Sequence, residues 1–215
     1  MYQRFVKRVF DIILSGAGLL ILSPAYLVLA ILVRVCLGSP VLFRQERPGR
    51  GEKIFTLKKF RTMTDKRGAD GKLLPDRERL TSFGKFLRAT SLDELPELWN
   101  IFVGDMSVIG PRPLLVSYLP YYTERERKRH SVRPGLTGLA QVSGRNYLAW
   151  DKRLEKDVEY VEHITFINDV KILMKTVSVA LKPANVAEDT NQAEGNFAQI
   201  RKAQQEGSKA DSFPL

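Results

Sequence analysis

An uncharged apolar segment near the N-terminus constrains this chain more than any other feature. The 22 residues from Ile12 to Val33 carry no charge and are rich in Leu, Ile, Val and Ala. About 20 such residues suffice to cross a bilayer as a helix. The run is longer than the apolar part of a cleaved signal peptide, and no small-residue cleavage site follows it. The segment therefore predicts a protein that enters a membrane.

Ser23 and Pro24 interrupt this segment at its centre. Proline removes a backbone donor and kinks or breaks a helix, and the Ser23 hydroxyl can bond to backbone groups freed at the break. Basic residues, which favour the cytoplasmic side, flank both ends of the run: Arg4, Lys7 and Arg8 before it, and Arg34, Arg44, Arg47 and Arg50 after it. A re-entrant helix over residues 1–38, which returns to the face it entered, satisfies both flanks. A kinked spanning helix is the alternative.

The charge balance indicates an anionic partner. The chain has 34 Lys and Arg against 24 Asp and Glu, a net charge of +10. Between Val41 and Thr90 there are 14 basic and 6 acidic residues, so +8 of the excess lies directly after the apolar segment. Such a field suits nucleic acid, anionic lipid or a phosphorylated substrate. The basic stretch lacks the interleaved aromatic residues or recognition helix of a nucleic-acid binder, so we expect no nucleic-acid partner.

Cysteine and histidine usage limits the metal chemistry. Cys36 is the single cysteine, which rules out an internal disulfide. With only His130 and His163 beside it, a His/Cys zinc site lacks ligands. Any metal must be held by oxygen atoms.

Residues 39–182 predict one mostly helical α+β domain. Strand-like segments at 41–43 and 54–57 surround the turn-rich residues 48–51, which predicts a small β-hairpin. Short helices are expected around 83–87 and 95–102, and a polar helix at 123–129.

Two segments near the C-terminus differ in their patterns. Between Phe166 and Leu181 the apolar residues fall on one helical face, so this amphipathic helix belongs either to the core or to a membrane interface. Residues 183–215 are polar with isolated apolar residues, which predicts a poorly packed tail or weak helix.

Ser91–Pro96 contains the principal candidate site. Ser91 followed three positions later by Glu94 has the spacing of a helix capping box. The same spacing puts Asp93 and Glu94 in the first turn of a helix, where backbone N–H groups and the helix dipole also favour phosphate. Asp93 could attack phosphorus while Glu94 helps to hold Mg²⁺, which prefers oxygen ligands. Without other information, a plain helix start is the simpler interpretation.

Several basic residues are candidate anion contacts. Pro111 and Pro113 fix the backbone around Arg112, so its guanidinium would be ready for paired contacts with phosphate oxygens. A surface arginine in a rigid turn is the ordinary interpretation. Alternation along the second strand puts Lys59 on one face, where a solvated strand edge is the ordinary interpretation. Glycine-rich turns at 133–138 and 144–146 would bring Arg145 close to a neighbouring group, although as motifs they are weak.

Seven ordered strings together resemble the bacterial sugar transferase family, the monotopic phosphoglycosyl transferases. The strings are Lys7–Asp11, Pro40–Gln45, Lys59–Met63, Ser91–Pro96, Gly104–Ser107, Gly110–Pro113 and Arg133–Gly138. The likeness runs from about Lys7 to Thr176. The chain has few residues outside the stretch that holds these strings. It is similar to small members of the family such as the diacetylbacillosaminyl phosphate transferase of bacterial protein glycosylation.

The resemblance implies a function and a location. The chain would transfer a phosphosugar from a UDP-sugar to undecaprenyl phosphate and release UMP, as the first membrane step of glycoconjugate or glycoprotein glycan assembly. It implies a re-entrant helix, a catalytic domain on the cytoplasmic face of the bacterial inner membrane, and Mg²⁺ held by Asp93 and Glu94. The competing interpretation is a non-enzymatic basic module that binds membranes.

The resemblance also implies a mechanism and roles for individual residues. The reaction would run in two steps through an aspartyl-phosphosugar on Asp93. Arg112 would hold phosphate, and Lys59, Arg88 and Arg145 would be further anion contacts. Neither the oligomeric state nor the sugar follows from these strings.

Overall fold

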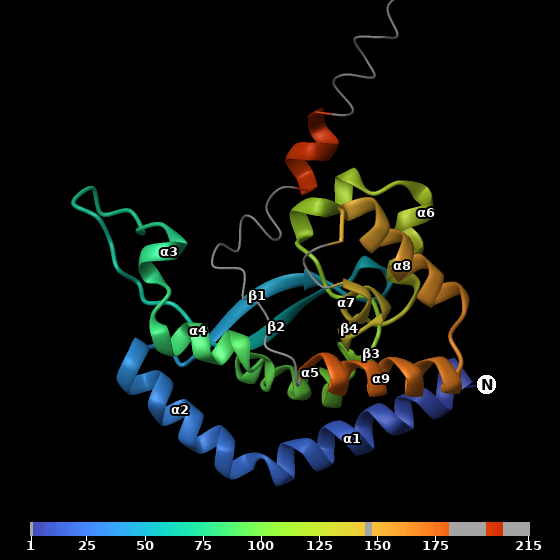
Figure 1. The fold of residues 1–215 in the computed structure, drawn as a ribbon, viewed down its shortest axis with the longest axis horizontal. Coiled ribbons are helices and arrows are strands. Elements are labelled where there is room, and N and C mark those ends of the chain that lie inside the picture. Colours follow the sequence, from blue (N-terminus) through green and yellow to red (C-terminus); the bar gives the residue numbers. More distant parts are fainter. Residues whose placement is uncertain (1, 145–147, 181–196, 204–215) are drawn as a thin grey trace, which may run out of the picture.

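The computed structural model describes residues 2–144, 148–180 and 197–203. These residues form a mostly helical α+β fold, as predicted. Figure 1 shows the bent pair α1–α2 along one side, with α5, α9 and the β-hairpin above it and α6 and α8 on the far side. The helices are α1 Lys7–Ile21, α2 Ser23–Leu37, α3 Asp76–Arg79, α4 Ser82–Ala89, α5 Glu97–Val103, α6 Glu124–Arg127, α7 Leu139–Gly144, α8 Trp150–Glu162 and α9 Phe166–Ala180. The strands are β1 Leu42–Pro48, β2 Ile54–Phe60, β3 Ser107–Ile109 and β4 Gly135–Thr137.

The predicted helix break is confirmed. The axes of α1 and α2 differ by 63° at a break of one residue, Leu22. Ser23 Oγ donates to the Leu20 carbonyl at 2.8 Å, as the sequence suggested. Among the described helices, none alone has the length and apolar character to cross a bilayer, although α1 and α2 together do.

Polar contacts join α1 to α5 and β3. Arg8 donates to the Ile101 and Phe102 carbonyls at 2.6 and 2.8 Å, where α5 ends and its carbonyls lack helical partners. Asp11 is buried and accepts a hydrogen bond from Ser107 Oγ at 3.0 Å. These contacts fix α1 against α5 and β3.

A buried carboxylate joins α1 to α9. Asp169 accepts hydrogen bonds from Lys7 Nζ and Tyr2 Oη at 2.6 Å each, and from Tyr160 Oη at 2.8 Å. Three donors compensate this buried charge. The start of α9 consequently lies against the start of α1 (Figure 1).

The β-hairpin is confirmed and is longer than predicted. β1 and β2 are antiparallel, with Leu42 opposite Phe60 and Phe43 opposite Lys59. Phe60 is buried in a cluster with Leu29, Val33, Leu37 and Leu87. This cluster joins the hairpin to α2 and α4.

The glycine-rich turns pack against each other in a way that the sequence did not predict. β3 and β4 are parallel, with Ser107 opposite Gly135. A Cβ on Gly135 would lie 2.1 Å from the Gly110 nitrogen, and one on Gly110 would lie 2.6 Å from the Arg133 carbonyl oxygen. Only glycine permits such a close backbone approach. The turn that carries Arg112 is thereby pressed onto the start of β4.

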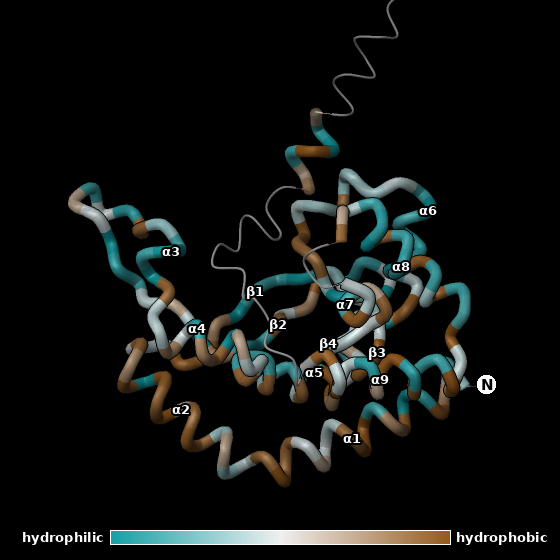
Figure 2. Tube along the Cα trace, in the orientation of Figure 1, coloured by the Kyte–Doolittle hydropathy of each residue, from teal (hydrophilic) through white to brown (hydrophobic). Residues whose placement is uncertain are grey.

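The apolar face of α9 is exposed, which excludes the interpretation of α9 as an ordinary core helix. Met174 is 66 % exposed and Val177 52 %. Figure 2 shows that α1 and α2 also carry long hydrophobic stretches on the same side of the molecule. Exposed apolar residues on these helices include Val9, Phe10, Ile13, Leu20, Ile21, Leu27, Val28, Ile31, Val35, Phe166, Ile167, Val170 and Leu173.

Part of the predicted tail is packed into the body. Residues 197–203 are helical, and Phe197 is fully buried. Its ring lies 5.0 Å from that of Tyr118 and 5.1 Å from that of Trp150, centroid to centroid. The expectation of a poorly packed tail is therefore wrong for Phe197, because one aromatic residue fills the space between these rings.

Candidate active site

The backbone at Ser91–Pro96 differs from the predicted helix start. Ser91 lies in the left-handed region at φ 57° and its side chain makes no capping hydrogen bond. Leu92–Glu94 form a 3-10 turn, and α5 begins only at Glu97. Pro96 has no N–H to bond the Leu92 carbonyl, which accepts from Leu95 N instead. The predicted capping box is wrong here, and Thr123 with Glu126 forms one at α6.

Asp93 is buried, but its carboxylate is not paired with a cation or a hydrogen-bond donor among the described residues. The residue is 8 % exposed, and its carboxylate makes no hydrogen bond or ion pair with the residues that the structure describes. Burial raises the pKa of Asp93 to about 6, against the lowering effect of Lys59, and the negative charge of Glu94 raises it further. A carboxylate in this state is available as a nucleophile at neutral pH.

Glu94, in contrast to Asp93, is paired with two cations. Its Oε1 accepts from Lys59 Nζ at 2.6 Å and from Arg112 Nη2 at 2.7 Å. Burial opposes ionisation, but the two cations outweigh it and lower the pKa of Glu94 below its ordinary value. The structure thus brings together four predicted site residues, Asp93, Glu94, Lys59 and Arg112.

The Arg112 turn is held from beneath by a buried ion pair. Arg129 Nη2 donates to the Arg112 carbonyl at 2.6 Å and to Asp157 Oδ2 at 2.8 Å. Arg129 and Asp157 are each 2 % exposed. The flanking prolines alone suggested a rigid turn. The buried pair of Arg129 and Asp157 also anchors this turn, through the Arg112 carbonyl, to the body of the protein.

Of the two remaining predicted anion contacts, the structure describes Arg88 but not Arg145. Arg88 lies at the end of α4, close enough to help lower the pKa of Asp93, and its Nε donates to Thr62 Oγ1 at 3.1 Å. Arg145 lies outside the described residues, so its proposed contact with anions stays a prediction.

Glu97 is a site residue that the sequence reasoning missed. It is 2 % exposed, and its Oε1 lies 3.1 Å from Lys59 Nζ without an aligned hydrogen bond. Burial, opposed by Lys59 and reinforced by Glu94, raises the pKa of Glu97 to about 7. Its position three residues after Glu94 was the available signal, because a helical turn brings such residues to one side.

The oxygen atoms present fit a Mg²⁺ ion that is shared with a substrate. No group of three or more His, Cys, Asp or Glu side chains among the described residues is arranged to hold a metal by itself. Mg²⁺, however, commonly binds one or two carboxylates together with substrate phosphates. Within the described part of the chain, the Asp93 carboxylate and Glu94 Oε2 have no hydrogen-bond partner, so both can serve as ligands.

Comparison with known proteins decides the family. The family model described as "Bacterial sugar transferase" matches residues 2–183. The chain belongs to this family. It is an enzyme, a sugar transferase, as the seven strings predicted.

Named relatives add further information. The chain is 51 % identical over 176 residues to "Uncharacterized sugar transferase EpsL" of Bacillus subtilis (strain 168), covering 82 % of this chain and 87 % of the relative. It is 40 % identical to "Undecaprenyl-phosphate galactose phosphotransferase" of Salmonella typhimurium, covering 84 % of this chain and 41 % of the relative. It is 41 % identical to "UDP-glucose:undecaprenyl-phosphate glucose-1-phosphate transferase" of Klebsiella pneumoniae, covering 80 % and 39 %. The chain thus spans about two fifths of these two longer relatives.

Proposed function

We propose that this sugar transferase moves a sugar phosphate from a UDP-sugar to undecaprenyl phosphate through a covalent intermediate on Asp93. One observation carries the proposal. The Asp93 carboxylate is buried and makes no hydrogen bond or ion pair with the described residues, and it lies beside the cluster of Lys59, Glu94 and Arg112. The names of two relatives, which specify undecaprenyl phosphate and galactose or glucose, support the proposed substrates.

In the first step an Asp93 oxygen attacks the sugar-proximal phosphorus of the donor. The bond to the bridging oxygen breaks, and UMP leaves with the electron pair. The leaving phosphate and the transferred phosphoryl group both carry negative charge, which the Lys59 ammonium and the Arg112 guanidinium stabilise. These cations are already held in place by Glu94. They can turn to the donor's diphosphate when it arrives, which frees Glu94.

In the second step a phosphate oxygen of undecaprenyl phosphate attacks the same phosphorus. The bond between phosphorus and Asp93 breaks, and the carboxylate regains its electron pair. Asp93 and Glu94 would hold Mg²⁺, which would supply positive charge to offset the negative charge of the phosphate groups. Each step is a displacement at phosphorus, and neither requires a histidine or cysteine.

The proposed location is the cytoplasmic face of the bacterial inner membrane. The bent α1–α2 pair, with basic residues at both ends, supports a re-entrant helix. The exposed apolar face of α9 supports contact with lipid at the interface. In this arrangement membrane lipids surround α1 and α2, and the site receives a soluble donor from one side and a lipid acceptor from the other.

A panel of UDP-sugars tests the proposal. The full chain in nanodiscs is incubated with Mg²⁺, undecaprenyl phosphate and UDP-glucose, UDP-galactose or UDP-diacetylbacillosamine, and UMP is measured. We expect UMP from one donor and a matching lipid-linked sugar diphosphate. A folded protein that binds vesicles but releases no UMP with any donor would favour the alternative of a non-enzymatic membrane module.

A further inference from the structure

Residues 197–203 form a short helix (red in Figure 1) whose first side chain completes an aromatic cluster. Phe197 is fully buried. Its ring lies against those of Tyr118, Trp150 and Tyr122, with centroids 5.0, 5.1 and 5.5 Å away. Aromatic rings at such separations stabilise one another beyond the burial of their surface. The helix is therefore fixed to the body of the protein by its first residue.

Arg201 attaches the same helix to α6 and α8. Its Nη2 donates to Glu126 Oε1 on α6 at 2.5 Å and to Asp151 Oδ1 on α8 at 2.7 Å. The guanidinium also lies 5.4 Å from the centroid of the Phe197 ring. Arg201 is four positions after Phe197, a spacing that brings two side chains to one side of a helix. The docked face of this helix thus carries an aromatic ring and, one turn later, a cation.

Buried contacts lead from this helix to the candidate site. The Arg129 guanidinium lies 5.6 Å from the centroid of the Tyr122 ring, and its Nη1 donates to Tyr122 Oη at 3.4 Å. Nη2 of the same arginine donates to the Arg112 carbonyl at 2.6 Å. Phe197 is therefore separated from the Arg112 backbone by two buried side chains.

The two attachments of the helix converge on the stretch of chain that leads to Arg129. Phe197 packs on Tyr122, seven positions before it. Arg201 pairs with Glu126, three positions before it. Both contacts restrain the backbone from which the Arg129 side chain reaches the candidate site.

We propose that the helix at 197–203 positions Arg112 to bind the donor's diphosphate, with Phe197 as the positioning residue. The proposal rests on the proposed function, in which the Arg112 guanidinium stabilises the phosphates. Removing the Phe197 ring leaves a cavity into which Tyr122 and Arg129 can shift. The Arg112 carbonyl then loses its fixed donor, and a guanidinium that is no longer held in place binds phosphate less well.

A double-mutant cycle separates this role from a contribution to stability alone. Donor affinity is measured at equilibrium in the full chain in nanodiscs, with whichever of UDP-glucose or UDP-galactose binds more tightly. All proteins carry Asp93→Asn, so that no adduct forms. Phe197→Ala and Arg112→Lys are introduced singly and together, and denaturant unfolding checks that each protein is folded at the assay temperature. A loss of stability alone reduces the amount of binding protein and leaves the donor Kd unchanged.

We expect Phe197→Ala to raise the donor Kd roughly fivefold where Arg112 is intact, and by less than about twofold in the Arg112→Lys background. The effect is partial because the turn has a second attachment, from Arg47 Nη1 to the Pro113 carbonyl at 3.3 Å. Phe197→Leu keeps much of the apolar volume and should give an intermediate Kd.

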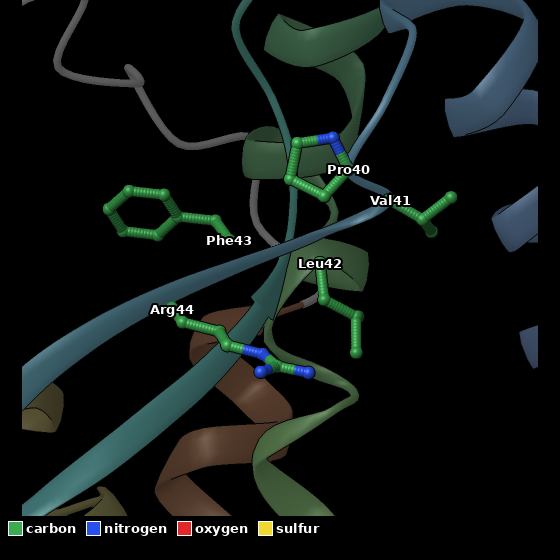
Figure 3. Close-up of a pocket in the computed structure, with 5 residues that line it drawn as sticks. All are labelled: Pro40, Val41, Leu42, Phe43 and Arg44. Atoms are coloured by element: carbon green, nitrogen blue, oxygen red, sulfur yellow. The ribbon is translucent and has the colours of Figure 1, made fainter.

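The ion pairs of the helix provide an independent variant with a matched control. Arg201→Gln breaks these pairs but leaves every aromatic ring in place, so it should raise the donor Kd roughly twofold. Arg44→Gln removes an equal charge from an exposed arginine on β1 that makes no ion pair with the residues that the structure describes (Figure 3). Arg44 is opposite Lys58 in the hairpin register, so it lies on the face of the hairpin away from Lys59. This control should leave the donor Kd unchanged.

Three results would overturn the assignment. An unchanged Kd in Phe197→Ala would show that the helix contributes stability alone. An equal increase with and without Arg112 would show that the helix acts on the donor by another route. Equal effects of Arg44→Gln and Arg201→Gln would indicate a general effect of surface charge.

The test does not depend on one variant or on turnover. If Phe197→Ala fails to fold, Phe197→Leu and Arg201→Gln decide the question by the same criteria. A protein with Asp93 intact that forms no adduct would contradict the proposed function itself. The Kd values are measured without turnover, so they would still decide whether the helix positions Arg112.

Discussion

At the scale of single residues, the site depends on the different surroundings of two adjacent carboxylates. Glu94 is bound by Lys59 and Arg112 and stays ionised, because those cations outweigh its burial. Asp93 is buried with no such partner, and the charge of Glu94 makes its ionisation harder. Environments that push neighbouring pKa values apart assign different roles to chemically similar groups. These surroundings fit the proposal in which Asp93 reacts and Glu94 organises cations.

The raised pKa predicts an acid limit for the first half-reaction. The Asp93 carboxylate must be ionised to attack phosphorus, and its pKa of about 6 means that the reactive form is lost as the pH falls through 6. Adduct formation without acceptor should therefore be nearly constant above pH 7 and decline below 6. The acceptor is omitted because its own phosphate titrates near this pH.

Glu97 supplies the control for this profile, since its pKa is raised to about 7. Glu97→Gln keeps the side-chain shape and removes that titration. An acid limit near pH 6 should persist in this variant. A limit that disappeared with Glu97 would assign the titration to Glu97, and the role given to Asp93 in the profile would be wrong.

Substitution of Asp93, the proposed nucleophile, should abolish both half-reactions. Asp93→Asn preserves the side-chain shape but removes the anion that attacks phosphorus, so neither adduct nor turnover should be detected. The parent incubated with UDP-sugar alone should release at most stoichiometric UMP and gain one phosphosugar on the peptide containing Asp93. Glu94→Gln is the companion variant and should slow both steps without abolishing the adduct. Turnover by folded Asp93→Asn would refute the covalent mechanism.

The sequence identified the two candidate carboxylates, Asp93 and Glu94, better than the residues that surround them. Asp93, Glu94, Lys59 and Arg112 could be named because three of the seven family-like strings carry them. Glu97 was missed although its spacing from Glu94 offered a signal, because that spacing alone does not distinguish a buried glutamate from one on a solvated helix face. Its burial depends on β2 lying against α5, a long-range contact.

At the scale of elements, the turn that carries Arg112 depends on the buried pair of Arg129 and Asp157. Removing one partner from a buried ion pair typically costs about 3–5 kcal/mol, whereas replacing both with apolar residues is often neutral. Asp157→Asn should therefore lower the free energy of unfolding by an amount of that order. The double variant Arg129→Met/Asp157→Leu should recover much of this stability.

The same double variant should remain poor in catalysis, because the Arg112 carbonyl has lost its donor. We expect a lower rate of adduct formation at saturating donor in spite of recovered stability. Denaturant unfolding and acceptor-free UMP release measure the two quantities separately. Parent-like adduct formation in the stable double variant would show that the pair serves stability alone.

Short elements with local signals were predictable, whereas the parallel pair was not. The hairpin follows from two apolar runs around a glycine-rich turn, and α4 and α5 follow from apolar spacing. β3 and β4 have three residues each and depend on contact between Gly110 and Gly135, which lie 25 positions apart. Such short strands lack any periodicity that would reveal them.

At the scale of the whole molecule, the apolar surfaces of α1, α2 and α9 lie on one side, and α8 lies on the other (Figures 1 and 2). If this side meets lipid, Met174→Glu should weaken vesicle binding of the protein. Losing one buried Met side chain costs about 2 kcal/mol, which corresponds to roughly a 30-fold decrease in partitioning. Sedimentation with vesicles measures this. Lys152→Glu on α8 is the control and should bind like the parent, and equal loss in both would indicate a simple charge effect.

The bent pair also predicts that both ends of the membrane segment lie on one side of the bilayer. The break at Leu22 turns the chain by 63°, and basic residues precede and follow the run. A spanning helix would place one basic flank outside the cell, against the usual preference. In a variant whose exposed native Cys36 is replaced by serine, single cysteines are introduced at Gln3 or Ser39. An impermeant thiol reagent should label neither in intact cells and both in inside-out vesicles.

The break itself can be varied in the same assay. Pro24→Ala restores the missing backbone donor and favours a straighter helix, so a fraction of the molecules should span the membrane. In those molecules one of the two cysteines becomes accessible from outside. Ala25→Gly, one position further on, leaves Pro24 in place and is the matched control. Labelling of either cysteine from outside in the parent protein would establish a spanning segment, and the re-entrant arrangement would then be abandoned while the transfer chemistry at Asp93 remained open to its own tests.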